Sequence, residues 1–253
     1  MELAQLTWPQ VDRLPRSLPV IIPVAAVEQH GHHLPLITDS LLLGEIVRRA
    51  EQVCGEECLL LPLTWLGNSH HHLDFPGTLS AEPRQWIDMT SGLVDNMLQH
   101  GFQRILIING HGGNDVPSRQ ALFELRQQQR QRADLLLLSA TYWTLAEPDG
   151  SIPLAQSQMQ HACEWETSMV QRIAPQLVGD FAAQPAVSAE SGFEPAHRAW
   201  ITKDRTIDGH IGQPAAATPE KGEHLLQTFS CGLTTLIRKM AAWDGAAWSL
   251  EKS

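Results

Sequence analysis

Four apolar stretches of strand length recur at intervals along the first 143 residues of the chain. Each is a nearly continuous run of apolar residues, without the alternation of a half-exposed strand. Such runs are typical of parallel strands that are covered on both faces of a sheet. We therefore predict four buried parallel strands, over residues 20–28, 58–66, 104–110 and 134–143.

The segments between these runs have a longer period. Their apolar residues recur every three or four positions, and each segment begins with a Thr, Ser or Asp that can cap a helix. This pattern predicts amphipathic helices over residues 38–52, 80–100 and 115–132. Because alternating strands and helices favour right-handed crossovers, we predict an α/β fold, a three-layer α/β/α sandwich with a mostly parallel central sheet. The order of the strands is left open.

The pattern loosens after Trp143. One helix is predicted to begin near His161 and another to span residues 219–243, with an irregular, Gly- and Pro-rich stretch over residues 180–218 between them. Long loops in compact domains usually have a function or are disordered, so this stretch either closes over a pocket or contacts a neighbouring subunit. The length of 253 residues fits a single domain over residues 1–253.

The charge of the chain excludes some classes of partner. Its 28 acidic and 18 basic residues give a formal net charge of −10, which repels phosphate backbones and anionic membranes. The first residues do not resemble a signal peptide, and no apolar run approaches the roughly 20 residues that span a bilayer. We expect a cytoplasmic protein with reduced cysteines that binds neither nucleic acid nor membrane.

The first predicted strand ends in a polar sequence, EQHGHHLPLITD, over residues 28–39. If the strand conformation continues, Glu28 and His30 leave it by the same face, and a short loop can return Asp39 to the same place. Carboxylates together with an imidazole suit Zn2+, Mn2+ or Fe2+. The alternative is that Asp39 caps the next helix and the histidines lie on a loop.

The third predicted strand also ends in a polar sequence, NGHGGND, over residues 109–115. The glycines around His111 allow tight turns and close approach of the backbone. Ligands of open parallel sheets bind beyond the carboxyl ends of the strands, so both polar sequences are expected to face one site. The sequence does not match the phosphate-binding pattern G-x-x-x-x-G-K-[ST].

Two further segments carry several polar groups. In HACEWETS, His161 and Glu164 are three positions apart and are predicted to share a helix face, with Glu166 pointing elsewhere. The alternative is a charged first turn that complements the helix dipole. The histidine run over residues 70–72 is predicted to be an exposed loop.

Five motifs together resemble a known family. The chain is similar to the creatininase (creatinine amidohydrolase) family over most of its length, through EQHGHHLPLITD, HLDFPGT, NGHGGN, HACEWETS and GQPAAATPEKG in that order. This resemblance implies a creatininase-like fold and hydrolysis of an amide-type C–N bond in a small polar metabolite. It also implies two divalent metal ions per subunit (Zn2+, Mn2+ or Fe2+) and a homohexamer built as a trimer of dimers.

The resemblance also implies which residues bind the metals. It assigns one ion to Glu28, Asp39 and His111. It assigns the other ion to His30 and to the same Asp39, which therefore bridges the two.

One ligand position departs from creatininase itself. Creatininase takes a further carboxylate two residues after the histidine that corresponds to His111, and this chain has Gly113 there. We expect Glu164 to complete the second metal's ligands instead. The resemblance further implies that His161 handles a proton, with Glu164 or Glu166 as a relay. The implied substrate-binding residues are His72, Gly112, Gly113 and His161.

The substrate is not expected to be creatinine. Gly112 stands where creatininase has a tyrosine that positions its ring, and Tyr142 is the only tyrosine of the chain. Two other classes of function stay open. A metal-dependent phosphoesterase could use the same ions but would gain from Arg or Lys in these motifs. A non-catalytic metal-binding scaffold of the same fold would turn over no amide.

Overall fold

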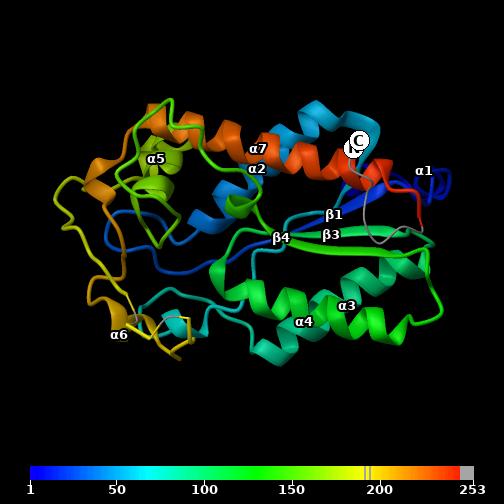
Figure 1. Ribbon diagram of the computed structural model, residues 1–253, viewed down its shortest axis with the longest axis horizontal. Coiled ribbons are helices and arrows are strands. Elements are labelled where there is room, and N and C mark those ends of the chain that lie inside the picture. The colour runs from blue at the N-terminus through cyan, green and yellow to red at the C-terminus, as the bar shows by residue number, and fades with distance from the viewer. Residues whose placement is uncertain (191, 194, 246–253) are drawn as a thin grey trace.

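A computed structural model, which describes residues 1–190, 192–193 and 195–245, contains a four-stranded parallel sheet in the order β2-β1-β3-β4 (Figure 1). Its strands are β1 (Pro19–Val24), β2 (Leu59–Leu60), β3 (Arg104–Asn109) and β4 (Leu136–Thr141). All four predicted strands are confirmed in place and in direction. β2 is much shorter than the predicted run because Pro62 follows it and has no N–H to give to a ladder.

The end of β1 differs from the prediction in a way that matters for function. The strand stops at Val24, and the chain continues as a loop through Glu28 and His30. The alternation of side chains along a strand therefore does not orient these two residues. They are placed by the loop itself, in which Glu28 N–H donates to Leu36 O and Leu34 N–H donates to His30 O.

Helices cover both faces of the sheet (Figure 1). One layer contains α2 (Thr38–Cys54), α5 (Glu164–Ile173) and α7 (Pro219–Ala242), and the other contains α3 (Pro83–Gln99) and α4 (Asp115–Gln128). The short helices are α1 (Trp8–Asp12) and α6 (Thr202–Arg205). Single 3-10 turns are η1 (Leu3–Gln5), η2 (Gly55–Glu57), η3 (His70–His72), η4 (Gly112–Asn114), η5 (Tyr142–Thr144), η6 (Pro175–Leu177) and η7 (Pro214–Ala216).

The central strands separate two apolar cores. Alternate residues of β1 and β3 point to opposite layers, and burying each such side chain contributes about 1.5–3 kcal/mol relative to its exposure. This explains the continuous apolar runs in the sequence. Ile21, Leu106 and Ile108 pack in the core under α2, α5 and α7, whereas Val20, Ile22, Ile105 and Ile107 pack in the core under α3 and α4.

The loops that follow the strands gather at one end of the sheet, because all four strands run in the same direction (Figure 1). The segment over residues 180–218 also lies at this end and carries α6 and η7, with most of its described residues irregular, as predicted. Within the described part of the chain, no helix is long and apolar enough to cross a membrane.

Candidate metal centre

Asp39 lies between two histidines that come from different loops. It is in the first turn of α2 and is almost fully buried. Its Oδ1 lies 3.1 Å from His30 Nε2, and its Oδ2 lies 3.0 Å from His111 Nδ1. Ile37 occupies the N-cap position of α2, so Asp39 is not the cap. One carboxylate thus faces two imidazoles, as a bridging ligand would.

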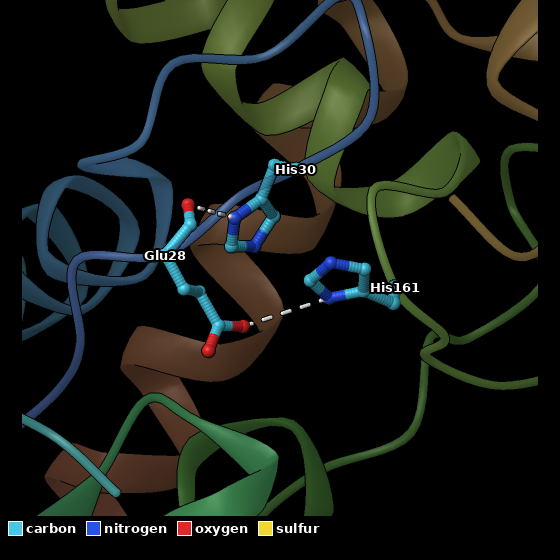
Figure 2. Close-up of side chains that lie close together, drawn as sticks. All are labelled: Glu28, His30 and His161. Carbon is cyan, nitrogen blue, oxygen red and sulfur yellow. Dashed lines mark hydrogen bonds and ion pairs between the residues drawn. The ribbon is translucent and has the colours of Figure 1, made fainter. Parts of the chain in front are cut away.

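Each of these histidines is held by its other ring nitrogen. His30 Nδ1 lies 3.2 Å from Glu28 O, and His111 Nε2 lies 3.0 Å from Asn68 O (Figure 2 shows the first contact). Because a carbonyl oxygen accepts, these nitrogens carry the proton in the neutral rings. The lone pairs of His30 Nε2 and His111 Nδ1 then point at carboxylates, which is the arrangement of metal-binding histidines.

A second carboxylate accompanies each histidine. Glu28 Oε2 lies 3.3 Å from His111 Nδ1, and Glu166 Oε1 lies 3.7 Å from His30 Nε2. All of these side chains are buried. We name the set the Asp39 cluster; its members are Glu28, His30, Asp39, His111 and Glu166.

Several atoms of the cluster lack the partners that burial demands when both rings are neutral. In that state Glu28 Oε2, His30 Nε2 and Asp39 Oδ2 are inaccessible to solvent and make no hydrogen bond among the described residues. Leaving such a group unsatisfied costs roughly 1–3 kcal/mol. A divalent cation between these oxygens and nitrogens would satisfy all three, and mixed carboxylate and imidazole ligands suit Zn2+ or Mn2+. The residues present therefore fit a metal site.

The electrostatics of the cluster also favour a cation. Burial alone would lower the pKa of His111, but Glu28 and Asp39 raise it to about 10. The pKa of His30 is raised well above its ordinary value, because Asp39 and Glu166 outweigh burial. Burial raises the pKa of Asp39, yet His30 and His111 hold it far below its usual range. The cluster is thus a strongly negative pocket that binds protons when no metal is bound.

Glu164 lies outside the cluster, contrary to its predicted place among the metal ligands. Helix α5 begins at Glu164, so His161 precedes it and the two do not share a helix face. The Glu164 carboxylate accepts from Lys221 Nζ at 2.6 Å and from the backbone N–H groups of Ala155 and Gln156. With both oxygens engaged, Glu164 faces α7, and Glu166 faces His30 instead of pointing elsewhere.

His161 lies beside the cluster, in the loop before α5 (Figure 2). Its Nε2 is 2.9 Å from Gln29 O, and its Nδ1 is 3.7 Å from Glu28 Oε1. Burial, with the nearby His30, lowers the pKa of His161 well below its ordinary value. With the Nε2 proton donated to Gln29 O, the neutral ring presents an unprotonated Nδ1 to the cluster.

The histidine run over residues 70–72 is not the exposed loop that was predicted. It forms η3, and His72 is buried with its Nε2 3.3 Å from Glu28 Oε1. Burial and the neighbouring His71 lower the pKa of His72 to about 2, so its ring is neutral. His71, which the sequence did not single out, stacks on His111 at 5.6 Å between ring centroids. Its place in the motif next to His72 was the available signal.

Gln29 is a second site residue that the sequence argument missed. Its Nε2 lies 2.8 Å from His72 Nδ1 and 2.9 Å from both His161 Nε2 and Gly209 O. Its two amide protons go to His72 Nδ1 and Gly209 O, and its backbone O accepts from His161 Nε2, so Gln29 connects the two histidines that flank the cluster. Strand alternation would have turned this residue away from Glu28 and His30, which is why it was overlooked.

The two glycines after His111 have opposite surroundings. A Cβ on Gly113 would collide with Asn68 O and with the His111 ring, so no acid fits there without displacing the bond that orients His111. A Cβ on Gly112 would have no atom within 4 Å, so open space lies at this exposed position next to His111 in sequence. No metal-binding side chain therefore fits at position 113, whereas position 112 leaves room for another molecule.

Comparisons of the sequence with a family profile and with known proteins indicate the same family. The profile of the family described as "Creatininase: Creatinine amidohydrolase" matches residues 4–237. The creatinine amidohydrolase of Pseudomonas putida is 25% identical over 255 residues, covering 94% of this chain and 96% of the relative. The mycofactocin precursor peptide peptidase of Mycobacterium tuberculosis is 27% identical over 253 residues, covering 91% and 88%.

The fold agrees with solved structures of creatininase. A creatinine amidohydrolase (creatininase) crystal structure superposes with a TM-score of 0.81 at 23% sequence identity, covering 96% of this chain and 98% of that one. A creatininase mutant complexed with creatine gives the same TM-score and identity. The α/β architecture with a parallel sheet is therefore that of creatininase. Together with the family match over nearly its whole length, this shows that the chain belongs to the creatininase family of amidohydrolases.

Proposed function

We propose that this protein is a dinuclear metal-dependent amidohydrolase. Glu28, Asp39 and His111 would hold one divalent ion, and His30, Asp39 and Glu166 the other. The observation that carries this proposal is the position of Asp39, whose two oxygens face His111 and His30 separately. Each histidine has its own additional acid, so the donor atoms divide into two sets around one shared carboxylate.

The solved relatives support the choice of metals. One creatininase structure is described as "Zn-Zn type" and another as "Creatininase Mn". Divalent ions of this kind, when bound, lower the pKa of water toward about 7 and polarise a substrate carbonyl. We therefore expect Zn2+ or Mn2+, with Fe2+ as a further candidate because the same ligand types bind it.

His161 is the residue placed to move a proton. Its Nδ1 faces the cluster, and its Nε2 is anchored to Gln29 O. A neutral imidazole can take a proton at Nδ1 during attack and return it to the leaving nitrogen, a role worth about 100- to 10,000-fold in rate. Glu166 would act as a ligand, and Glu164, engaged by Lys221, is not available as a relay.

The substrate class follows from the relatives and from the space at the site. The names of the relatives describe cleavage of a cyclic amide (creatinine) and of a peptide. Both reactions break a C–N bond, so we propose a small amide-containing metabolite as substrate. Open space lies at Gly112, the position at which creatininase has the tyrosine that positions its ring. We therefore do not expect creatinine itself as the substrate. A cytoplasmic location, a single domain and a homohexamer stay predictions.

The test combines metal analysis with a substrate panel. Purified protein is stripped with chelator, reloaded with Zn2+ or Mn2+, and assayed on linear amides, cyclic amides and phosphomonoesters. We expect about two ions per subunit, amide turnover that needs metal, and no phosphate release. Phosphate release without amide cleavage would assign a phosphoesterase instead. Two bound ions with no turnover of any amide would favour the non-catalytic scaffold.

A further inference from the structure

A six-residue segment of the irregular region lies against the metal centre. Residues 200–205 contain α6, and this helix packs on η3. The buried Thr202 Oγ1 lies 2.8 Å from His72 Nδ1, and His72 Nε2 is 3.3 Å from Glu28 Oε1. The segment is therefore fixed to the Asp39 cluster through one intervening side chain, although about 130 residues separate Thr202 from His72 in sequence.

Aromatic contacts connect the same segment to His111. His71 stacks on His111 with ring planes 12° apart, and Trp200 meets His71 edge-on at 4.9 Å between centroids. The Arg205 guanidinium lies 4.5 Å above the Trp200 ring. Trp200 is 42% exposed, so its ring and Arg205 border solvent on the His111 side of the site. Open space lies at Gly112, next to the same histidine in sequence.

Arg205 carries a charge that the described residues leave unpaired. Its guanidinium donates to Ala189 O at 3.1 Å, and no carboxylate of the described residues forms an ion pair with it. Burial lowers the pKa of Arg205, and no acidic group of the described residues opposes that shift. Seven of the fourteen arginines form an ion pair with a carboxylate of the described residues, and Arg205 is among the seven that do not. Arginine binds carboxylates with directed, charge-assisted hydrogen bonds.

We propose that Arg205 and Trp200 form a specificity subsite that binds a carboxylate of the substrate. This inference rests on the proposed amidohydrolase function and names its substrate class: amides that carry a carboxylate, such as N-acylated amino acids or short peptides. Trp200 and His71 provide a ring surface along which the substrate lies, and Arg205 fixes its charged end. The scissile carbonyl is then oriented toward the Asp39 cluster.

A merely structural role for Arg205 predicts something different. If its function is to hold Ala189 and Trp200 in place, replacement should lower the thermal midpoint or reduce activity on every substrate alike. Carboxylate binding instead predicts a loss that depends on the charge of the substrate. The difference between a free acid and its carboxamide separates the two readings.

The experiment uses metal-loaded, full-length protein and N-acetylated glycine, diglycine and triglycine, each as free acid and as carboxamide. The varied length tests several distances between the scissile amide and the terminal carboxylate. For at least one length we expect kcat/KM about 10- to 100-fold higher for the acid. Arg205→Gln should abolish that preference, because kcat/KM for the acids falls to the level of the carboxamides. Arg205→Lys should retain part of it.

Lys203→Gln is the matched control, because it removes one positive charge from the same short helix. Lys203 lies over the Phe75 ring, whereas Arg205 lies over the Trp200 ring, so the variant should keep the wild-type preference. An equal loss on acid and carboxamide in Arg205→Gln, or no preference in the wild type at any length, would overturn the subsite. If Arg205→Gln does not fold, the same comparison is made with Arg205→Lys.

Binding measurements keep this inference separate from the proposed function. Calorimetric titration with the same six compounds is read for the wild type and Arg205→Gln even if none is hydrolysed. Arg205-dependent binding of the acids without turnover would uphold the subsite and count against the amidohydrolase proposal. Amide turnover that does not depend on Arg205 would support the amidohydrolase proposal and count against the subsite.

Discussion

Two buried glutamates of α5 stand two positions apart and have opposite surroundings. Glu164 is saturated: Lys221 and the backbone N–H groups of Ala155 and Gln156 take its oxygens. Glu166 accepts from Ala162 N–H and turns its other oxygen to His30 Nε2, 3.7 Å away. Glu164 is paired with Lys221, a cation of the chain itself. Glu166 lies in a cluster in which several buried atoms lack partners.

The difference teaches how to recognise a ligand among buried acids. Burial alone does not distinguish these residues, since both side chains are nearly inaccessible. The two are distinguished by whether neighbouring groups already satisfy the carboxylate. A carboxylate that is paired and hydrogen-bonded stabilises the fold, whereas a buried set of unsatisfied ligand atoms requires a bound cation. We name Glu164, Lys221 and the two backbone groups the Lys221 network, to be compared with the Asp39 cluster.

The largest expected effect follows from replacing the carboxylate that both halves of the cluster share. Asp39→Asn keeps the shape of the side chain but removes the charge that faces His30 and His111. We expect loss of most bound metal and at least a 1,000-fold fall in amide turnover, because both ions lose a ligand. Metal content is measured by elemental analysis. A variant that kept two ions per subunit would show that Asp39 does not bridge.

The second prediction compares the two glutamates directly. Glu166→Gln should lose about one ion per subunit and roughly 100-fold or more in turnover, because His30 and Asp39 alone cannot complete the second site. Glu164→Gln should keep its metal. It should instead lower the free energy of unfolding by about 1–3 kcal/mol, because Lys221 loses a charged partner.

Elemental analysis and chemical denaturation of both variants decide this comparison. The two substitutions are chemically identical and lie on the same turn of α5, so each serves as the control for the other. A loss of metal in Glu164→Gln with full occupancy in Glu166→Gln would reverse the assignment and restore the prediction made from the sequence.

A more limited effect, on turnover but not on metal content, is expected from replacing His161 in the loop just before this helix. His161→Gln should retain both ions and the stability of the wild type, since His161 is bonded to the loop through Gln29 O and belongs to neither ligand set proposed here. Turnover should fall by about 100- to 10,000-fold, because the proton carrier is lost. The change should appear in kcat with little change in KM. An unchanged kcat would remove His161 from the mechanism, and loss of an ion would make it a ligand.

The fold could be predicted well because its signals are local. Continuous apolar runs such as residues 104–110 identify strands buried between two layers, and the helices over residues 38–54 and 83–99 lie within a few residues of their predicted bounds. The pairing of Leu59 and Leu60 with β1 is a tertiary contact that a local pattern does not give, although Pro62 marks in the sequence where β2 ends. Strand order was also beyond local pattern.

The site could be predicted only in part. Glu28, His30, Asp39 and His111 come together as their motifs indicate, because parallel strands bring their following loops to one end of the sheet. The choice between Glu164 and Glu166 depends on where α5 begins and on Lys221, 57 residues away in sequence. Spacing within HACEWETS carries neither fact.

The smallest expected effect is a difference in proton balance between the Asp39 cluster and the Lys221 network. In the metal-free protein the pKa of His111 is about 10, so its ring holds an extra proton near pH 8, and the pKa of His30 is raised as well, which favours a second proton there. Metal binding must displace these protons, and its apparent Kd should fall about tenfold per pH unit for each proton released, up to about pH 10. The Lys221 network lies outside the Asp39 cluster and binds no metal, so it contributes nothing to this proton release.

Calorimetric titration of Zn2+ into metal-free protein, in two buffers with different heats of ionisation, counts the protons. We expect at least one proton per subunit at pH 8 in the wild type and the same number in Glu164→Gln, because that substitution leaves the Asp39 cluster intact. Glu166→Gln should release fewer, since the carboxylate that helps to raise the pKa of His30 is gone. Binding without proton release would mean that His30 and His111 are neutral before metal arrives, and that the cluster is less negative than its three carboxylates imply.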